Sequence, residues 1–165
     1  MSAELSFRMT FDPRQIEARI SLNLIPPKEM PPIAWAALEA GHDGQAIRRM
    51  AAFDNPTGFE TDRFLPAFMK ETGMSTLSRE RASLRVAYDK ARQILDCRND
   101  PLASADFFEK LWVRADYPRE MQELGMMSDE IYLAESFGQT RDDVRRTMKD
   151  KLILFVRDFE TISEK

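Results

Sequence analysis

The chain has 165 residues, of which 43% are hydrophobic and 32% charged, so it has enough apolar surface for the core of about one domain. A net charge of −4 argues against a general nucleic-acid binder. One cysteine and one histidine exclude an internal disulfide framework and a metal site built from several histidines of one chain.

The sequence predicts a cytoplasmic protein that does not enter a membrane. Residues 1–10 include Glu4 and Arg8 and lack the basic start and apolar run of a signal peptide. The longest apolar run, residues 152–156, is far shorter than the roughly 20 residues that span a bilayer.

The first predicted helix begins after Asp12, a favoured N-cap, at Pro13, a residue type favoured in the first turn. Residues 18–24 also alternate apolar and polar side chains, as a strand would. The start signal favours the helix. Residues 1–12 are interpreted as an extended arm that packs on the core.

Two short helices are expected next. Pro31 and Pro32 open the second helix, and Gly41 ends it, because glycine adopts a left-handed conformation at little cost. Asp43 is expected to cap the third helix.

Thr57 and Glu60 form a capping-box pattern at the start of the fourth helix, which closes at Gly73. Pro66 lies inside this helix and predicts a kink or a restart there. A fifth helix is predicted from one apolar stripe: Leu77, Leu84, Tyr88, Ala91 and Leu95.

The second half of the chain continues with helices. Asp100 and Pro101 start the sixth, Pro118 starts a short seventh, and Ser128 is expected to cap another short one. Thr140 caps the last helix. The predicted inner face of the sixth helix is Ala105, Phe108, Leu111, Trp112 and Ala115. The predicted inner face of the last helix is Val144, Met148, Leu152, Phe155, Phe159 and Ile162.

These signals together predict an all-α fold, an irregular bundle of about eight helices built from helix hairpins with short loops. No flexible linker or low-complexity stretch marks a boundary, so residues 1–165 are expected to form a single helical domain. No fixed period supports a repeat solenoid.

Two residue patterns resemble catalytic or metal-binding motifs, and in both cases a structural role is the better interpretation. Glu39 and His42 have the Glu-x-x-His spacing of di-iron bundles, but such a site needs the motif twice. Cys97 could pair with His42 as nucleophile and base, but neither lies in a recognisable signature. Phosphate-binding glycine loops are absent from the sequence. The sequence therefore assigns no catalytic, cofactor-binding or metal-binding residue.

Several apolar side chains are candidates for a partner or ligand surface. Consecutive methionines in an expected loop are adaptable, and the last helix carries two apolar residues outside its predicted stripe. The simpler interpretation is that these residues fill the core. The candidates are Trp35, Trp112, Met126, Met127, Ile153 and Val156.

Residues 30–43 (MPPIAWAALEAGHD) and 46–51 (AIRRMA) resemble a family of small bacterial helical proteins without an assigned activity. That family has a Leu-Glu-x-Gly-x-Asp turn followed by a Leu-Arg-x-Leu-Ala-like helix. The resemblance covers the first half of the chain, through Gly73. It implies an all-helical fold and a bacterial cytoplasm, and it implies no activity.

Two functions fit these observations. The first is a non-enzymatic protein-interaction protein, such as an accessory, adaptor or immunity-like protein, which binds another protein or a second copy of itself. The alternative is a small-molecule-binding or enzymatic helical domain with a pocket between helices near Trp35 and Trp112. The missing catalytic constellations favour the first, with no cofactor and no nucleic-acid partner.

Overall fold

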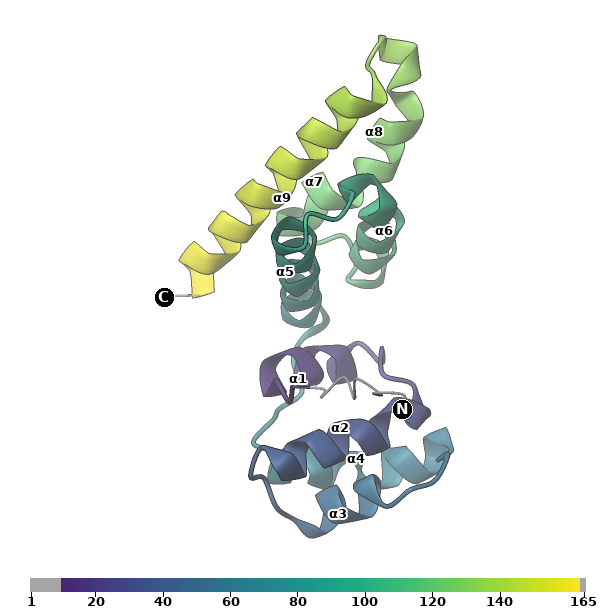
Figure 1. Cartoon of the computed structure of the whole chain (residues 1–165), viewed down its shortest axis with the longest axis vertical. Helices are drawn as coiled ribbons and strands as arrows, with labels where there is room; N and C mark the ends of the chain where they lie inside the picture. The colour runs from purple at the N-terminus through teal and green to yellow at the C-terminus, as the bar shows by residue number, and fades with distance from the viewer. Residues whose placement is uncertain (1–9, 164–165) are drawn as a thin grey trace, which may run out of the picture. The chain divides into compact units, whose positions relative to one another are not determined.

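The computed structural model describes residues 10–163 and is all-α, as the sequence predicted (Figure 1). The chain divides into two compact units, unit 1 (Met1–Leu77) and unit 2 (Ser78–Lys165). The sequence analysis expected one domain and placed no boundary there. The composition of the sequence does not mark this boundary. The connection is only a short stretch without regular structure, residues 74–78, which leads directly into the next helix. Residues 1–9 of the predicted arm lie outside the described residues.

Unit 1 contains four α-helices and one short 3₁₀-helix among its described residues. They are α1 (Pro13–Ser21), η1 (Pro27–Glu29), α2 (Met30–Glu39), α3 (Gln45–Ala51) and α4 (Gly58–Glu71). Helix α3 packs against both α2 and α4. Prolines lie at the first or second position of α1, η1 and α2. The N–H groups of a first turn have no acceptor inside the helix, so a proline there removes no helical hydrogen bond.

Most helix boundaries of unit 1 follow the predicted caps. The Asp12 carboxylate accepts from the Arg14 N–H at 3.0 Å, and both bonds of the capping box between Thr57 and Glu60 are present. Gly41 has φ +91° just after α2, the left-handed conformation that favours glycine. The prediction that Asp43 caps α3 is wrong, because Gly44 is the N-cap and the Asp43 carboxylate binds Arg48 instead.

The core of unit 1 is apolar. Phe68 is fully buried at its centre, although Pro66 lies only two residues earlier. Helix α4 continues through Pro66 without the restart that the sequence allowed. The other buried members of this core are Ile16, Met30, Ile33, Ala34, Ala37, Ala46, Ile47, Met50, Ala51, Met69 and Met74.

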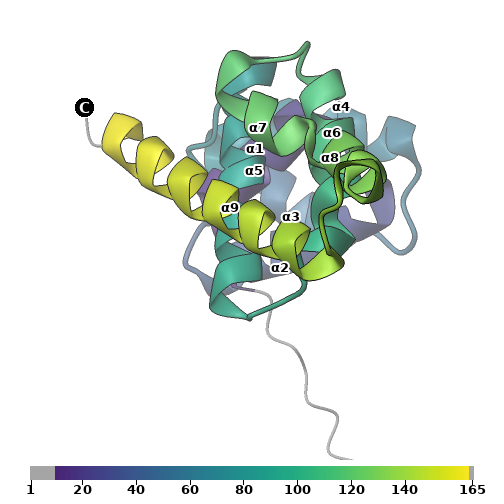
Figure 2. The same ribbon diagram turned by 90° about the horizontal axis from the view of Figure 1, so that it is seen from above.

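Unit 2 is built around two long helices, α5 and α9. Its α-helices are α5 (Arg79–Asp96), α6 (Ala105–Arg114), α7 (Gln122–Gly125), α8 (Met127–Leu133) and α9 (Arg141–Ser163). Three 3₁₀-helices connect them: η2 (Pro101–Ser104), η3 (Arg119–Met121) and η4 (Glu135–Phe137). Helix α9 lies across α5, α7 and α8 (Figures 1 and 2).

The predicted stripe of α5 is rotated relative to the buried face. Small residues are buried most deeply, whereas Leu84, Tyr88 and Leu95 are half-buried at its edge. The buried residues are Ala82, Ser83, Val86, Ala87, Ala91 and Ile94. Helix α5 contacts both α6 and α9, and small side chains let neighbouring helices approach closely. Tyr88 covers the edge by stacking on Phe159, with ring centroids 4.5 Å apart.

Helix α9 buries most of its predicted stripe, and two predictions at its end are wrong. Val144, Met148, Leu152 and Phe155 are buried, and Phe159 is half-buried. Ile162 is 67% exposed, because the helix extends past the elements that cover it. Val156, expected outside the stripe, is buried.

The remaining elements of unit 2 follow the sequence in outline. Asp100 caps η2, which leads into α6, and Trp112 on the predicted inner face of α6 is only half-buried. Ser128 does not cap α8, since Met126 is the N-cap and Ser128 lies in the first turn. Met126 and Met127 therefore join two helices rather than line a loop.

Candidate functional site

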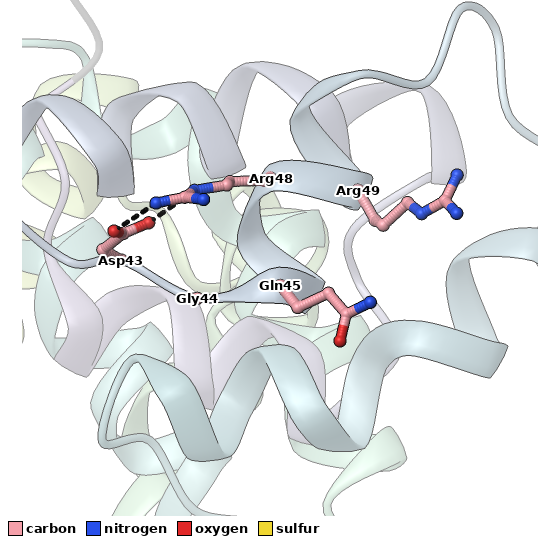
Figure 3. Close-up of a pocket in the computed structure, with 5 residues that line it drawn as sticks. All are labelled: Asp43, Gly44, Gln45, Arg48 and Arg49. Carbon is pink, nitrogen blue, oxygen red and sulfur yellow. Dashed lines mark hydrogen bonds and ion pairs between the residues drawn. The ribbon is translucent and has the colours of Figure 1, made fainter.

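A shallow hollow of about 360 Å³ lies at the start of α3, lined by Asp43, Gly44, Gln45, Arg48 and Arg49 (Figure 3). The Arg48 guanidinium donates Nε to Asp43 Oδ1 at 2.8 Å and Nη2 to Oδ2 at 2.6 Å. These hydrogen bonds lower the pKa of Asp43 below its ordinary value. The Arg49 side chain extends away from this pair (Figure 3).

The start of α3 is already occupied by a side chain of unit 1. Gly44 has no side chain to cap the helix, so Glu71 of α4 does so: its Oε1 accepts from the Ala46 N–H at 3.1 Å and its Oε2 from the Ile47 N–H at 3.0 Å. A Cβ on Gly44 would lie 2.2 Å from the Glu71 carboxylate. The N–H groups of Ala46 and Ile47 at the start of α3 therefore already have an acceptor, supplied from α4.

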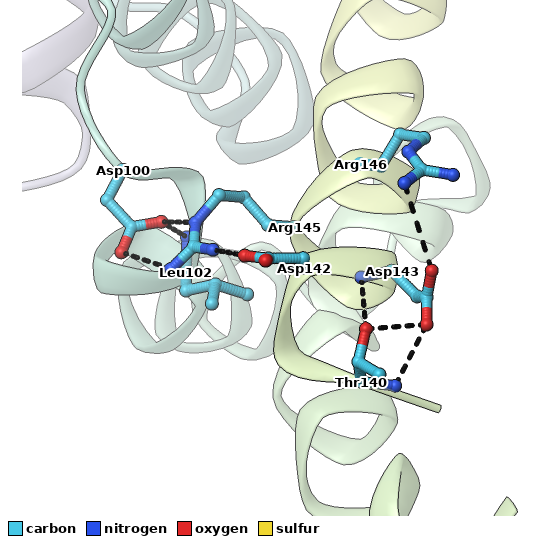
Figure 4. Close-up of polar contacts among 7 residues, drawn as sticks. All are labelled: Asp100, Leu102, Thr140, Asp142, Asp143, Arg145 and Arg146. Carbon is cyan, nitrogen blue, oxygen red and sulfur yellow. Dashed lines mark hydrogen bonds and ion pairs between the residues drawn. The ribbon is translucent and has the colours of Figure 1, made fainter. Parts of the chain in front are cut away.

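Charged side chains at the start of α9 also have structural roles (Figure 4). Arg145 Nε donates to Asp100 Oδ1 at 3.1 Å, and the same oxygen accepts from the Leu102 N–H at 3.1 Å. The hydrogen bond from Arg145 lowers the pKa of Asp100. Arg145 also pairs with Asp142. This cluster fixes η2 to the first turn of α9.

Thr140 caps α9 as predicted, and its partner is Asp143. The Asp143 N–H donates to Thr140 Oγ1 at 3.2 Å, and Asp143 Oδ2 accepts from the Thr140 N–H at 2.9 Å. The hydroxyl hydrogen bond is the main reason that the pKa of Asp143 is lowered. Asp142 and Asp143 both lie in the first turn, where negative charge is favoured.

Lys151 links three helices of unit 2. Its Nζ lies 3.0 Å from Glu123 of α7 and also pairs with Glu130 of α8. Burial lowers the pKa of Lys151, but the hydrogen bonds to the two carboxylates outweigh this and raise it overall. A lysine held charged between two carboxylates is a structural link.

The two tryptophans lie in different units and have different surroundings. Trp35 on α2 is 58% exposed. Trp112 on α6 is half-buried: its Nε1 donates to the Pro118 carbonyl at 3.0 Å, and its ring packs against Gly125 and, edge to face, against Tyr117. The two side chains therefore do not line a pocket within one compact unit.

The other candidate surface residues are also separated. Met127 and Val156 are buried, whereas Met126 and Ile153 are exposed. Ile153 lies on α9 between the charged neighbours Lys149, Asp150 and Arg157. The next residue, Leu154, is exposed to the same extent, and two apolar side chains among charged ones are ordinary on a protein surface.

Three exposed apolar side chains of unit 2 lie within six residues where α8 and η4 end, before the turn into α9 (Figure 1). Tyr132 is 83% exposed, Leu133 43% and Phe137 74%. Leu133 is the last residue of α8 and Phe137 the last residue of η4, so these exposed side chains stand at the ends of two successive short helices. We call these three residues, with Asp129 and Glu135, the α8–η4 tip.

The α8–η4 tip is acidic. Residues 127–140 contain Asp129, Glu130 and Glu135 and no lysine or arginine. Glu130 pairs with Lys151, while Asp129 and Glu135 have no cationic partner among residues 10–163. Sequence reasoning missed this site because it expected only a short helix after Ser128 and singled out no exposed residue on it. The signal was the run of three bulky apolar residues 131–133, which a helix of seven residues cannot bury on one side.

No group of three or more His, Cys, Asp or Glu side chains placed to hold a metal ion occurs among the described residues. His42 packs edge-on against Phe11, with ring centroids 5.1 Å apart, and belongs to unit 1, whereas Cys97 is exposed in unit 2. Between residues 10 and 163, every helix is too short or too polar to cross a membrane.

Comparison with known proteins identifies no relative: no family model, no curated protein and no solved structure matches the chain.

Proposed function

We propose that this chain is a non-enzymatic protein-interaction protein that docks its partner on the α8–η4 tip. The supporting observation is the exposure of Tyr132, Leu133 and Phe137 within six residues at a helix end. Exposed aromatic side chains at an element end are typical anchors of protein interfaces, since burying them releases much apolar area from water.

The chemistry of the tip favours a protein over a nucleic acid. Asp129 and Glu135 flank the aromatic residues and would repel a phosphate backbone. By contrast, α2 exposes a single large apolar side chain, Trp35, so the tip is the stronger of the two candidates. The proposal keeps the cytoplasmic location and the protein partner that the sequence analysis expected.

Site-specific photo-crosslinking tests the proposal. A photoreactive phenylalanine analogue at position 132 or 137 is expected to give a protein adduct in cells that make the chain. The adduct should disappear with excess wild-type chain and persist with excess Tyr132→Ser/Phe137→Ser chain. Position 117 is the matched control, because Tyr117 is an exposed aromatic residue outside the tip.

Two results would contradict docking at the tip. One is the absence of a competed adduct from positions 132 and 137. The other is an equally competed adduct from position 117, which would place the contact elsewhere on unit 2.

A further inference from the structure

Unit 1 carries a second exposed surface, of opposite charge, on α4. Phe59 is 82% exposed, and Arg63, Pro66 and Lys70 are exposed as well. Their spacing of four, three and four residues places them along one side of the helix. We call these four residues the α4 face.

The α4 face carries two cations, and two of the three acidic residues of α4 are engaged elsewhere. Glu60 closes the capping box at Thr57, and Glu71 caps α3. Asp62 is also exposed and lies beside the face, three residues after Phe59 and four before Pro66, so the face has two cations and one neighbouring carboxylate. Neither Arg63 nor Lys70 has a carboxylate partner among residues 10–163, although Arg63 lies over the Phe64 ring at 5.6 Å.

The α4 face and the α8–η4 tip are complementary. Each surface presents aromatic or other apolar side chains beside two charged residues that have no ion-pair partner in the described structure. These are Arg63 and Lys70 on the α4 face, and Asp129 and Glu135 on the α8–η4 tip. Opposite charges around an apolar contact favour encounter and fix its orientation. Two surfaces of one chain that match in this way allow head-to-tail contact between copies.

We infer that the partner of the α8–η4 tip is a second copy of this chain, which the tip contacts at the α4 face. The inference rests on the proposed docking function of the tip. Because tip and face are different surfaces, the contact is heterologous, and a bound pair keeps one tip and one face open. Association therefore continues beyond two copies unless the arrangement closes into a ring.

Charge reversal combined with mixing tests the inference. The tip variant Asp129→Lys/Glu135→Lys gives a basic tip opposite a basic face. The face variant Arg63→Glu/Lys70→Glu gives an acidic face opposite an acidic tip. Each variant alone is expected to lose at least about tenfold in self-association, measured as mass by light scattering at about 0.01–1 mM chain.

An equimolar mixture of the two variants is expected to regain association, since each tip then meets a face of opposite charge. The control Glu120→Lys/Asp150→Lys makes the same change in net charge as the tip variant, at exposed residues outside both surfaces, and should associate as the wild type does. Circular dichroism confirms that each variant retains its helices. Added salt should weaken the wild-type association, because the charges are exposed.

Three results would overturn the inference. The wild type could remain monomeric over this concentration range, the mixture of the two variants could stay dissociated, or the control could lose association as much as the tip variant does. These results leave the proposed function separately testable. A competed crosslink from position 132 to a different protein retains docking at the tip and rejects the second copy as partner. The absence of any competed crosslink rejects both.

Discussion

Units 1 and 2 differ in whether particular buried hydroxyl groups have a hydrogen-bond partner. In unit 1, Thr61 Oγ1 donates to the Gly58 carbonyl at 2.9 Å and Thr72 Oγ1 donates to the Phe68 carbonyl at 2.8 Å. In unit 2, Ser83 is fully buried, and its Oγ has no hydrogen-bond partner in the described structure. A buried hydroxyl group stabilises the fold when it has a hydrogen-bond partner and destabilises it when it has none. The degree of burial alone does not show which case applies.

The units also differ in how ion pairs connect their helices. In unit 2, ion pairs run between separate helices, such as Lys151 with Glu123 and Arg92 with Glu160. In unit 1, the pair between Arg48 and Asp43 spans only five residues around the start of α3. Unit 1 also links its elements through Glu71 and through Arg19 with Glu29, but its described ion pairs join residues close in the chain, whereas some of those of unit 2 join distant ones.

The largest expected effect comes from truncating the buried phenylalanine of each unit. Phe68→Ala and Phe108→Ala should each lower the free energy of unfolding by about 3–5 kcal/mol, because both side chains are fully buried and leave a cavity. Denaturant unfolding measures the loss, and hydrogen exchange assigns it to a unit. The exposed Trp35→Ala is the control, and a cost below about 1 kcal/mol for either phenylalanine would contradict its place in a tight core.

The next largest difference between the units is expected when a glycine is replaced by alanine, which adds one methyl group. In Gly125→Ala the new Cβ would lie 2.3 Å from Trp112 Cδ2, so the rigid indole must move, at a cost of about 1–3 kcal/mol. In Gly58→Ala of unit 1 the nearest atom is 3.9 Å away, and no loss is expected. Thermal unfolding of both variants measures the difference. Equal effects would mean that Trp112 is not packed on Gly125.

Replacing the buried hydroxyls should give effects of opposite sign. Ser83→Ala removes an unsatisfied polar group and should raise the free energy of unfolding by about 1 kcal/mol. Thr72→Val removes a hydrogen bond and should lower it by about 1 kcal/mol. Urea unfolding of both variants provides the measurement. A loss on Ser83→Ala would show that the serine hydroxyl has a partner.

The smallest effect is the dependence on pH of the contact between η2 and α9. The lowered pKa of Asp100 means that its stabilising contribution is present above the pKa of the unfolded chain, about 3.9, and is lost as pH falls through the lower folded value. Asp100→Asn should therefore lower stability at neutral pH and flatten its decline in acid. Asp150→Asn, at an exposed site without an ion pair in the described structure, should leave the pH profile unchanged.

Local features of the sequence determined much of the secondary structure. Asp12, Thr57 and Thr140 cap helices as predicted, because a cap depends on residues two or three positions away. The same holds for Gly41, whose left-handed conformation follows from its place after a helix end. The all-α class follows from such signals repeated along the chain.

Tertiary structure decided what depends on distant parts of the chain. Glu71, not Asp43, caps α3, because α4 brings a carboxylate from 25 residues away to Ala46. The buried face of α5 is set by α6 and α9 on two sides, so Ala91 of the predicted stripe is buried, whereas Leu84, Tyr88 and Leu95 are only half-buried. The exposure of Tyr132 and Phe137 likewise depends on which helices cover α8 and η4. Periodicity shows that a helix has an apolar side, but only packing decides which residues stay exposed to meet a partner.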